Sequence, residues 1–157
     1  MIKIRKYQAR DAKQVVRVIH NTFEKFNYGE HDKKAAQDYL NYFNPNQDQE
    51  NLEEILSNCP IMFVLQDSSS VVGVVRGRYN RIVNLFLLEK YHKKGLGKKL
   101  VQRFESEVRE KGSKHIKIRA SLYATPFYQA MGYKRTTGTR KMRKVGVLFN
   151  PMIKQLK

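Results

Sequence analysis

An apolar run at Ile82–Leu88 is followed, after a few polar residues, by glycines at positions 95 and 97 and then by a helical pattern of apolar residues. A strand that turns through glycine into a helix leaves the first amide N–H groups of the helix unpaired, and glycine lets a bulky anion approach the backbone. We therefore interpret the turn as a diphosphate-binding loop, with an ordinary tight turn as the alternative. The flanking lysines, which would add positive charge, are Lys93, Lys94, Lys98 and Lys99.

A second motif, Ser121–Tyr133, begins about thirty residues beyond the glycine loop and directly follows a strand-like run at His115–Ala120. Together the two segments resemble the GNAT superfamily of acetyl-CoA-dependent N-acyltransferases. The family pattern Q/R-x-x-G-x-G/A is matched at His92–Gly97, with histidine in place of Gln or Arg. The pattern N-x-x-A-x-x-x-Y-x-x-x-G-F/Y is matched, with serine in place of asparagine, at Ser121, Ala124, Tyr128, Gly132 and Tyr133.

The resemblance implies an α/β fold, with residues 1–157 forming a single GNAT-like domain that has a mixed central sheet and helices on both faces. Hydrophobic periodicity predicts the same alternation of elements. We expect Asp11 to cap the first helix, and the turn at Asp67–Ser70 to join a hairpin. Strands are predicted at 2–6, 61–66, 71–75, 82–88 and 115–120, and near 133–137 and 145–153. Helices are predicted up to Phe26, at 33–43, around 52–56, at 95–111 and at 125–131.

By the same resemblance, acetyl-CoA is the expected cosubstrate, bound along the strand at Val83–Leu88 and the loop at His92–Lys98. Amides at 95–98 would hold the pyrophosphate, and main-chain groups of the strand would bind the pantetheine arm, while the side chains of Leu85 and Leu87 look like ordinary core. His92 would either donate to a phosphate or cap the loop. The expected cofactor-binding residues are Leu85, Phe86, Leu87, His92, Lys93, Lys94, Gly95, Leu96, Gly97, Lys98, Ser121, Ala124 and Phe127.

Tyr128 is the candidate catalytic residue, because the tyrosine at this place in the family sits near the CoA sulfur and is assigned as the acid that protonates the departing thiolate. A phenol with an ordinary pKa of about 10 is protonated at neutral pH and can donate a proton to a thiolate. Simple aromatic packing is the alternative for Tyr128, and it is the role expected of Phe127.

The general base is not evident from the sequence. Asn84, on the expected central strand, cannot take a proton, and Glu89 fits a solvated loop charge. Glu30 or His31 is a possible base, because the segment between the first two helices lines the acceptor site in the fold that the chain resembles. A helix-capping role is expected for the neighbouring Asp32.

The net charge of +17 is unevenly distributed along the chain. Residues 1–60 contain nine Lys/Arg and nine Asp/Glu, whereas residues 61–157 contain 22 and five. After Glu110 the chain has twelve Lys/Arg and no acidic residue. Such a segment either docks an anionic partner such as RNA or is a solvated basic face. The basic residues singled out for docking are Lys134, Arg135, Arg140, Lys141, Arg143 and Lys144.

Several classes of protein fit the composition poorly. The N-terminus has no apolar leader-like segment and no run approaches the roughly 18 apolar residues of a membrane span, so we expect a cytoplasmic protein without membrane contact. The lone Cys59 excludes an internal disulfide and is expected to be a small buried residue. The four histidines show no metal-ligand spacing with Cys or carboxylates, so no metal is expected.

The predicted activity is transfer of acetyl from acetyl-CoA to a primary amine by direct attack, in a monomer or homodimer. The acceptor is a small molecule, peptide or protein amine, and a fold of this kind does not choose among them. Two other functions are considered: a CoA-binding sensor without catalysis, suggested by the missing base, and a nucleic-acid-binding module, suggested by the basic second half.

Overall fold

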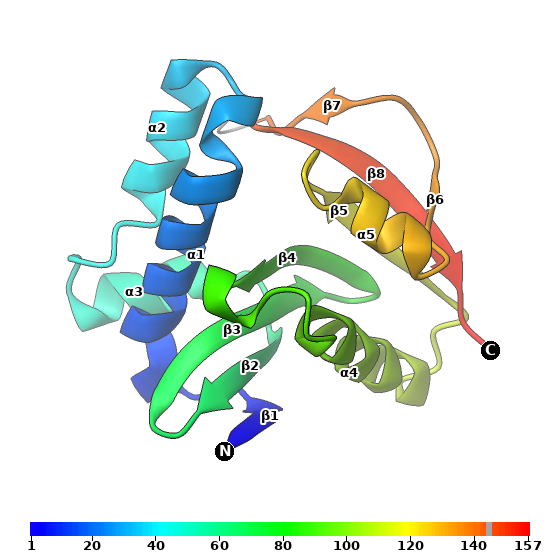
Figure 1. Cartoon of the computed structure of the whole chain (residues 1–157), viewed down its shortest axis with the longest axis horizontal. Helices are drawn as coiled ribbons and strands as arrows, with labels where there is room; N and C mark the ends of the chain where they lie inside the picture. The colour runs from blue at the N-terminus through cyan, green and yellow to red at the C-terminus, as the bar shows by residue number, and fades with distance from the viewer. Residues whose placement is uncertain (144–145) are drawn as a thin grey trace.

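A computed structural model describes residues 1–143 and 146–157 of the chain. The strands in these residues form one eight-stranded sheet in the order β1-β2-β3-β4-β5-β8-β6, and β7 pairs with β8 beside this path (Figure 1). The strands are β1 (Ile2–Lys6), β2 (Ile61–Asp67), β3 (Ser70–Arg78), β4 (Arg81–Leu87), β5 (His115–Ala120), β6 (Lys134–Arg135), β7 (Arg140–Lys141) and β8 (Leu148–Gln155). The α-helices are α1 (Ala12–Phe26), α2 (Lys33–Tyr42), α3 (Gln49–Leu56), α4 (Leu96–Glu110) and α5 (Thr125–Ala130), and 3-10 turns form η1 (Ala9–Asp11), η2 (Tyr28–Glu30) and η3 (Glu89–Tyr91).

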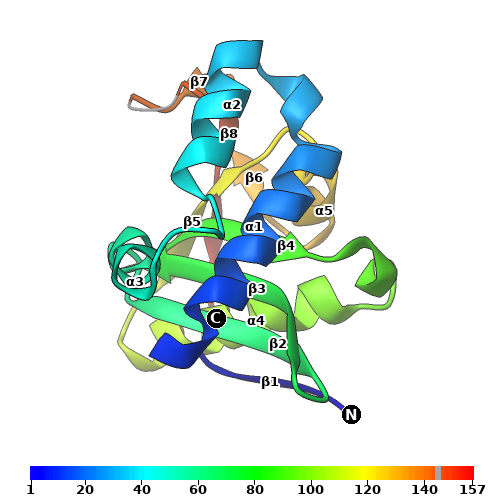
Figure 2. The same ribbon diagram turned by 90° about the vertical axis from the view of Figure 1, so that its left-hand side faces the viewer.

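Helices cover both faces of the sheet, as Figures 1 and 2 show from two sides. One apolar cluster packs α1, α2 and α3 against one face, and a second packs α4 and α5 against the other. Alternation along β2 serves both clusters, because Met62 and Val64 join the first whereas Phe63 and Leu65 join the second. The α/β class and the mixed sheet with helices on both faces are therefore confirmed. In the described part of the chain, no helix combines the length and apolar character needed to cross a bilayer.

The structure corrects the predicted elements mainly at their ends. Asp11 precedes α1, but its carboxylate does not cap that helix; it instead accepts a hydrogen bond from the Gln8 N–H and pairs with Arg5. The strand predicted near 133–137 is reduced to the two residues of β6, and β7 was not predicted. The strand predicted from Val145 begins at Leu148 in β8, and Val145 itself lies outside the described residues.

The two halves of the sheet part between β4 and β5. These strands are parallel, and among the described residues they pair only at Arg81↔Lys117 and Ile82↔Ile118. Beyond Ile82, β4 keeps β3 on one side and pairs with no strand of the described residues on the other. A β-bulge beside Gly77 accompanies this parting, and a side chain at Gly77 would run into the carbonyl oxygen of Arg81. The parting of β4 from β5 thus leaves one edge of residues 83–87 without a strand partner among the described residues.

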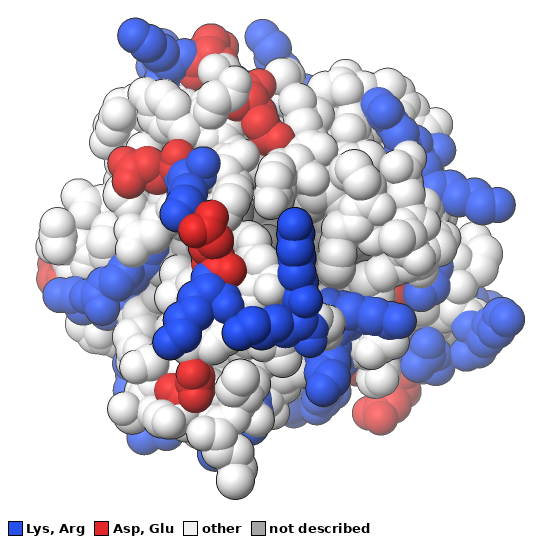
Figure 3. Space-filling view, viewed as in Figure 1, with Lys and Arg blue, Asp and Glu red and all other residues white. Residues whose placement is uncertain are grey.

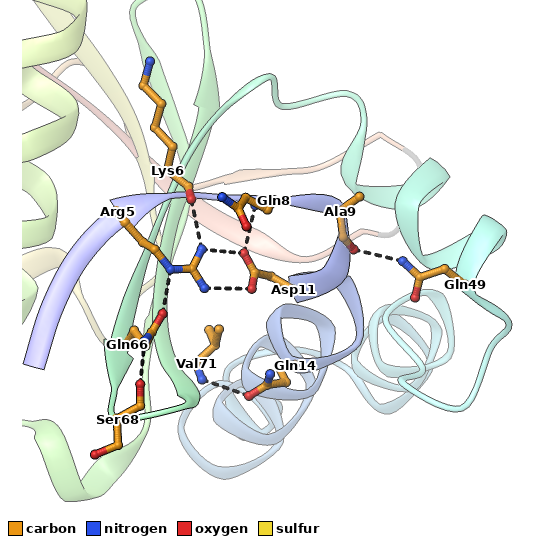
Figure 4. Close-up of polar contacts among 10 residues, drawn as sticks. All are labelled: Arg5, Lys6, Gln8, Ala9, Asp11, Gln14, Gln49, Gln66, Ser68 and Val71. Atoms are coloured by element: carbon orange, nitrogen blue, oxygen red, sulfur yellow. Dashed lines mark hydrogen bonds and ion pairs between the residues drawn. The ribbon is translucent and has the colours of Figure 1, made fainter. Parts of the chain in front are cut away.

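A buried ion pair fixes the N-terminal strand to the first helix (Figure 4). Two guanidinium nitrogens of Arg5 each donate to one carboxylate oxygen of Asp11 at 2.8 Å, and Arg5 Nε donates to Gln66 Oε1 at 2.6 Å. Burial alone raises the pKa of Asp11, but hydrogen bonds from Arg5 and from the Gln8 N–H outweigh it and lower the pKa overall. The pair therefore joins β1, η1 and β2 through one charged group.

We expect Asp11→Asn to lower the free energy of unfolding at pH 7 by about 1–3 kcal/mol, because it leaves a largely buried guanidinium without its counterion. Since the pKa of Asp11 is lowered on folding, its contribution is present above the unfolded-state pKa of about 3.9 and is lost as pH falls through the folded-state value. Chemical denaturation at pH 7 and in acid measures this. Asp38→Asn, at the exposed ion pair with Lys34, is the control and should change little. Equal stabilities of Asp11→Asn and wild type would contradict the prediction.

Candidate active site

A cavity of about 410 Å³ lies where β4 and β5 part. Its walls come from β4, the turn into α4, the segment from β5 into α5, helices α1 and α2, and the chain around β8. It brings together most of the residues predicted to bind the cofactor or act on it. Those that line it are Leu85, Phe86, Leu87, His92, Lys93, Gly95, Gly97, Lys98, Ser121, Ala124, Phe127 and Tyr128. Lys94 is exposed outside it, and the Leu96 side chain is buried in the core beneath α4.

The N-terminus of α4 presents unpaired amides to this cavity. Gly95 adopts the left-handed conformation (φ 75°) that glycine favours, and no side chain of residues 1–143 or 146–157 caps the helix. The first helical hydrogen bond runs from the Lys99 N–H to the Gly95 carbonyl at 3.1 Å, so the amides of residues 96–98 precede the regular pattern. The partial positive charge of the helix end is therefore available to an anion.

Lysine side chains reinforce this charge. Figure 3 shows Lys and Arg gathered over the junction of η3 and α4, next to a hollow lined by uncharged residues. Lys93, Lys94, Lys98 and Lys99 are exposed there, and Lys93 and Lys98 also line the cavity. A diphosphate at this point would meet backbone donors and flexible cations together.

The β4 side of the cavity offers main chain and few polar side chains. Phe86 and Leu87 are buried and Leu85 is half-buried, so all three side chains contribute to packing. The ring of His92 donates from Nε2 to the Leu87 carbonyl oxygen at 2.5 Å, because a carbonyl can only accept. Of the two roles considered for His92, this contact matches the one that secures the loop.

Tyr128 is held at the cavity by packing. Its ring is 2% exposed, and Phe127 meets it edge-on at 5.1 Å between ring centroids. No hydrogen bond to its hydroxyl is found within residues 1–143 and 146–157, and burial raises the pKa of the phenol. Ser121 holds the turn into α5, because its Oγ accepts from the Ala124 N–H at 3.1 Å. The phenol is thus a protonated and uncommitted donor at neutral pH.

The candidates for a general base are engaged elsewhere. His31 is buried, and its Nδ1 accepts from the Leu148 N–H at 2.9 Å, so the lone pair that would take a proton is occupied. Glu30 does not line the cavity; burial raises its pKa, and its carboxylate accepts from Asn27 Nδ2 at 2.9 Å. Asp32 caps α2 by accepting from the Ala35 N–H at 2.8 Å, as predicted. Asn84 lies between Arg76 and Tyr39 and bonds to both.

The α1 and α2 side of the cavity was not identified from the sequence. Phe23 stacks on Tyr39 at 4.0 Å, and Phe26 packs against His92 at 5.0 Å, so the wall on this side is aromatic. The sequence indicated Phe23 and Phe26 only as the apolar face of a helix. The other lining residues that sequence reasoning missed are Thr22, Asn27, Arg119, Tyr123, Met142, Val147, Leu148 and Phe149.

Metal ligands are not assembled at this site or elsewhere in the described residues, where no three His, Cys, Asp or Glu side chains come together. Cys59 is buried and free, as predicted. Acyl transfer to an amine needs a polarised carbonyl, a nucleophile and an acid for the leaving group, and the cavity offers backbone groups and Tyr128 for two of these.

Comparison with known proteins defines the class. The chain matches the family described as "Acetyltransferase (GNAT) domain" over residues 24–156. It therefore belongs to this acetyltransferase family, which confirms the family and the enzyme class expected from the sequence. Comparison with curated proteins gives no significant match.

Solved structures share the fold across nearly the whole chain. A GCN5-related N-acetyltransferase from Rhodopseudomonas palustris has a TM-score of 0.84 at 17% identity, covering 98% of this chain and 95% of that one. The PaiA N-acetyltransferase from Thermoplasma acidophilum, solved with coenzyme A, has a TM-score of 0.72 at 17% identity, with 99% of each chain covered. Ard1 from Thermoplasma volcanium has a TM-score of 0.69 at 19% identity, with coverage of 99% and 98%. At such identities the likeness establishes the fold alone.

We expect Gly97→Val to weaken acetyl-CoA binding by at least about tenfold while leaving a cooperative fold, because its side chain would stand between the α4 amides and a bound phosphate. A Cβ at Gly97 would meet Phe127 at 3.5 Å, an ordinary contact, so the protein itself can accommodate it. Calorimetric titration with acetyl-CoA, together with thermal unfolding, measures both effects. Gly138→Val, at a glycine with nothing within 4 Å of its Cβ, is the control. Unchanged affinity in folded Gly97→Val would rule out this loop as the phosphate site.

Proposed function

We propose that the protein transfers acetyl from acetyl-CoA to a primary amine by direct attack. One observation carries this proposal: the parting of β4 and β5 opens a cavity that collects the unpaired β4 edge, the free amides of α4 and the hydroxyl of Tyr128. These are the groups needed to hold a diphosphate, to polarise a thioester and to protonate a thiolate.

In the proposed reaction, the nitrogen lone pair of the acceptor attacks the thioester carbonyl, and a C–N bond forms. Main-chain N–H on the open edge of β4 stabilises the negative charge on the carbonyl oxygen. The C–S bond then breaks, and the sulfur takes the proton of the Tyr128 hydroxyl. The amine loses one proton as the amide forms, and Tyr128 regains its proton from the solvent.

The charge around the cavity favours an unprotonated amine. Lys93, Lys98 and Arg119 line it, and among its described lining residues there is no Asp or Glu. Nearby positive charge lowers the pKa of a bound ammonium, so the free amine is reached nearer to neutral pH. This reduces the demand on a protein base, which is consistent with the occupied lone pair of His31 and the engaged carboxylate of Glu30.

A CoA-binding sensor without catalysis is the second candidate, because no described side chain is poised as a base. The two candidates differ in a single measurement: release of free CoA from acetyl-CoA when an amine panel is added. Release that depends on the amine supports the transferase. Acetyl-CoA binding without release for any amine of the panel supports the sensor.

We expect Tyr128→Phe to lower kcat by about tenfold to a thousandfold and to leave acetyl-CoA affinity nearly unchanged, because only the proton donor is removed. Because the Tyr128 hydroxyl has no hydrogen-bond partner in the described part of the chain, stability should be almost unaffected. Tyr133→Phe is the matched control. Its hydroxyl is also buried but donates to Glu105 Oε2 at 2.6 Å, and Tyr133 does not line the cavity. Tyr133→Phe should lose stability and keep kcat. If Tyr128→Phe also loses stability and keeps kcat, Tyr128 serves only in packing.

We further propose that the basic C-terminal stretch docks an anionic partner such as RNA. Lys134, Arg140, Lys141 and Arg143 are exposed, and Arg135 donates to Asn150 at 2.9 Å; Lys144 lies outside the described residues. Each phosphate contact releases counterions, so affinity for RNA should fall steeply as salt rises.

Reversing the charge of Arg140, Lys141 and Arg143 should abolish RNA binding and spare acetyl-CoA binding, because the cofactor loop lies elsewhere. Affinity for single-stranded RNA across a salt series measures this. The control reverses three exposed cations of the first half, Lys3, Lys13 and Arg17. Weak binding that is insensitive to salt and equal in all three proteins would leave the stretch as a solvated face.

Three expectations from the sequence stay predictions: one domain over residues 1–157, a cytoplasmic location, and a monomeric or dimeric state.

A further inference from the structure

Where the β4–β5 pairing ends, the cavity contains an arginine that has no counterion among the described residues. Arg119 comes from β5, just before the strand gives way to the loop that begins at Ser121. Within residues 1–143 and 146–157, its guanidinium makes no ion pair and donates no hydrogen bond. It lies 5.4 Å from the ring centroid of Phe149, which lines the same cavity. A half-buried guanidinium with five donors and no acceptor among the described residues is suited to an anionic ligand.

Further arginines strengthen the positive potential around Arg119. Burial first, and then the charges of Arg81 and Arg78, lower the pKa of Arg119, which places these three groups within electrostatic reach of one another. Neither Arg78 nor Arg81 has an ion pair among the described residues. The cationic groups therefore act on the ligand without compensation from a carboxylate.

A fourth arginine, Arg76, lies behind the cavity wall and contacts the lining residue Asn84. Arg76 is 2% exposed, and its partners among the described residues are neutral: it donates to Asn84 Oδ1 at 2.7 Å, to Asn58 Oδ1 at 2.9 Å, and to the carbonyls of Leu56 and Ile55 at 3.2 and 3.4 Å. Its Nε has no hydrogen-bond partner among the described residues. Since Asn84 lines the cavity, this buried charge contributes to the potential there.

This arrangement is opposite to what a polycationic acceptor needs. A polyamine or an amino sugar requires carboxylates to replace its hydration, and none lines the cavity among the described residues. A purely apolar amine would leave the Arg119 guanidinium half-buried and unpaired beneath it. An amine that also carries an anion satisfies the guanidinium and gains charge-assisted hydrogen bonds.

We propose that the acceptor is an amine with an anionic group, a carboxylate or a phosphate, that pairs with Arg119. Its apolar part lies against the aromatic wall formed by Phe23, Phe26 and Tyr39, and its amine points toward the β4 edge. Arg119 is then the residue that selects the substrate class. This inference rests on the proposed acetyl transfer and specifies its substrate.

The test compares matched amines that differ in the anionic group. The carboxylate pairs are phenylalanine with phenylalaninamide and 4-(aminomethyl)benzoate with benzylamine; the phosphate pair is O-phosphoethanolamine with ethanolamine, and spermidine represents polycations. We expect kcat/KM to favour the anionic member of at least one pair by about tenfold or more. The pair that shows this preference distinguishes a carboxylate from a phosphate.

Variants assign the preference to Arg119. Arg119→Gln should lower kcat/KM for the preferred anionic amine about tenfold or more, chiefly by raising KM, and change its neutral partner by less than about twofold. Arg119→Lys should recover part of the loss, because it restores charge without the planar fork. Arg109→Gln, at an exposed arginine on α4 away from the cavity, should change neither. Thermal unfolding and acetyl-CoA affinity establish that each variant is folded.

Every outcome decides the inference. Preference for the neutral amines or for spermidine overturns it, as does equal kcat/KM for the two members of every pair or an Arg119→Gln effect of equal size on both members of a pair. Acetylation of neutral amines without any anionic amine overturns it while the proposed transferase activity stands. Absence of CoA release with every amine overturns the proposed activity itself, and this inference with it.

Discussion

The parting of β4 from β5 is the constraint on which the rest of the site depends. Interior strands of a sheet normally pair on both sides, because an unpaired backbone group away from water costs free energy. Here the pairing of β4 with β5 ends after Ile82↔Ile118, next to a bulge in the β3–β4 pairing at Gly77, where no side chain fits beside the Arg81 carbonyl. The edge of β4 beyond that point is left for another partner. The proposed pantetheine arm would satisfy it much as a strand would.

Positive charge lies at both ends of this cavity. The α4 N-terminus and its lysines lie at one end, and Arg119 with its neighbouring arginines lies at the other. No described carboxylate lines the space between them, although carboxylates such as Asp11 and Glu105 are buried elsewhere with cationic partners. A cavity of one sign of charge and low polarity raises the local concentration of anions. The proposed cosubstrate and the proposed acceptor are both anionic, so this one feature would serve both.

Prediction from sequence succeeded where an element is specified locally. The helices α2 and α4 follow the 3.6-residue period of their apolar positions, and the hairpin of β2 and β3 follows its serine-rich turn. It missed β7 and made β6 too long, because two-residue strands at a sheet edge have no periodicity to detect. It also misplaced the role of Asp11. A capping residue and an ion-pair partner look alike until Arg5, on another element, is positioned beside it.

The sequence by itself determined the cofactor end of the site. Gly95 and Gly97, the lysines around them and the motif containing Tyr128 act through backbone conformation and short spacing, which a linear pattern records. Only the tertiary structure decided the acceptor end. Arg119 alternates with buried residues along β5 like any solvent-facing strand residue, and His31 reaches the Leu148 N–H across 117 positions. Such contacts depend on how β8 pairs with β5 and on how the segment before α2 meets β8, and contacts between distant segments leave no local signature.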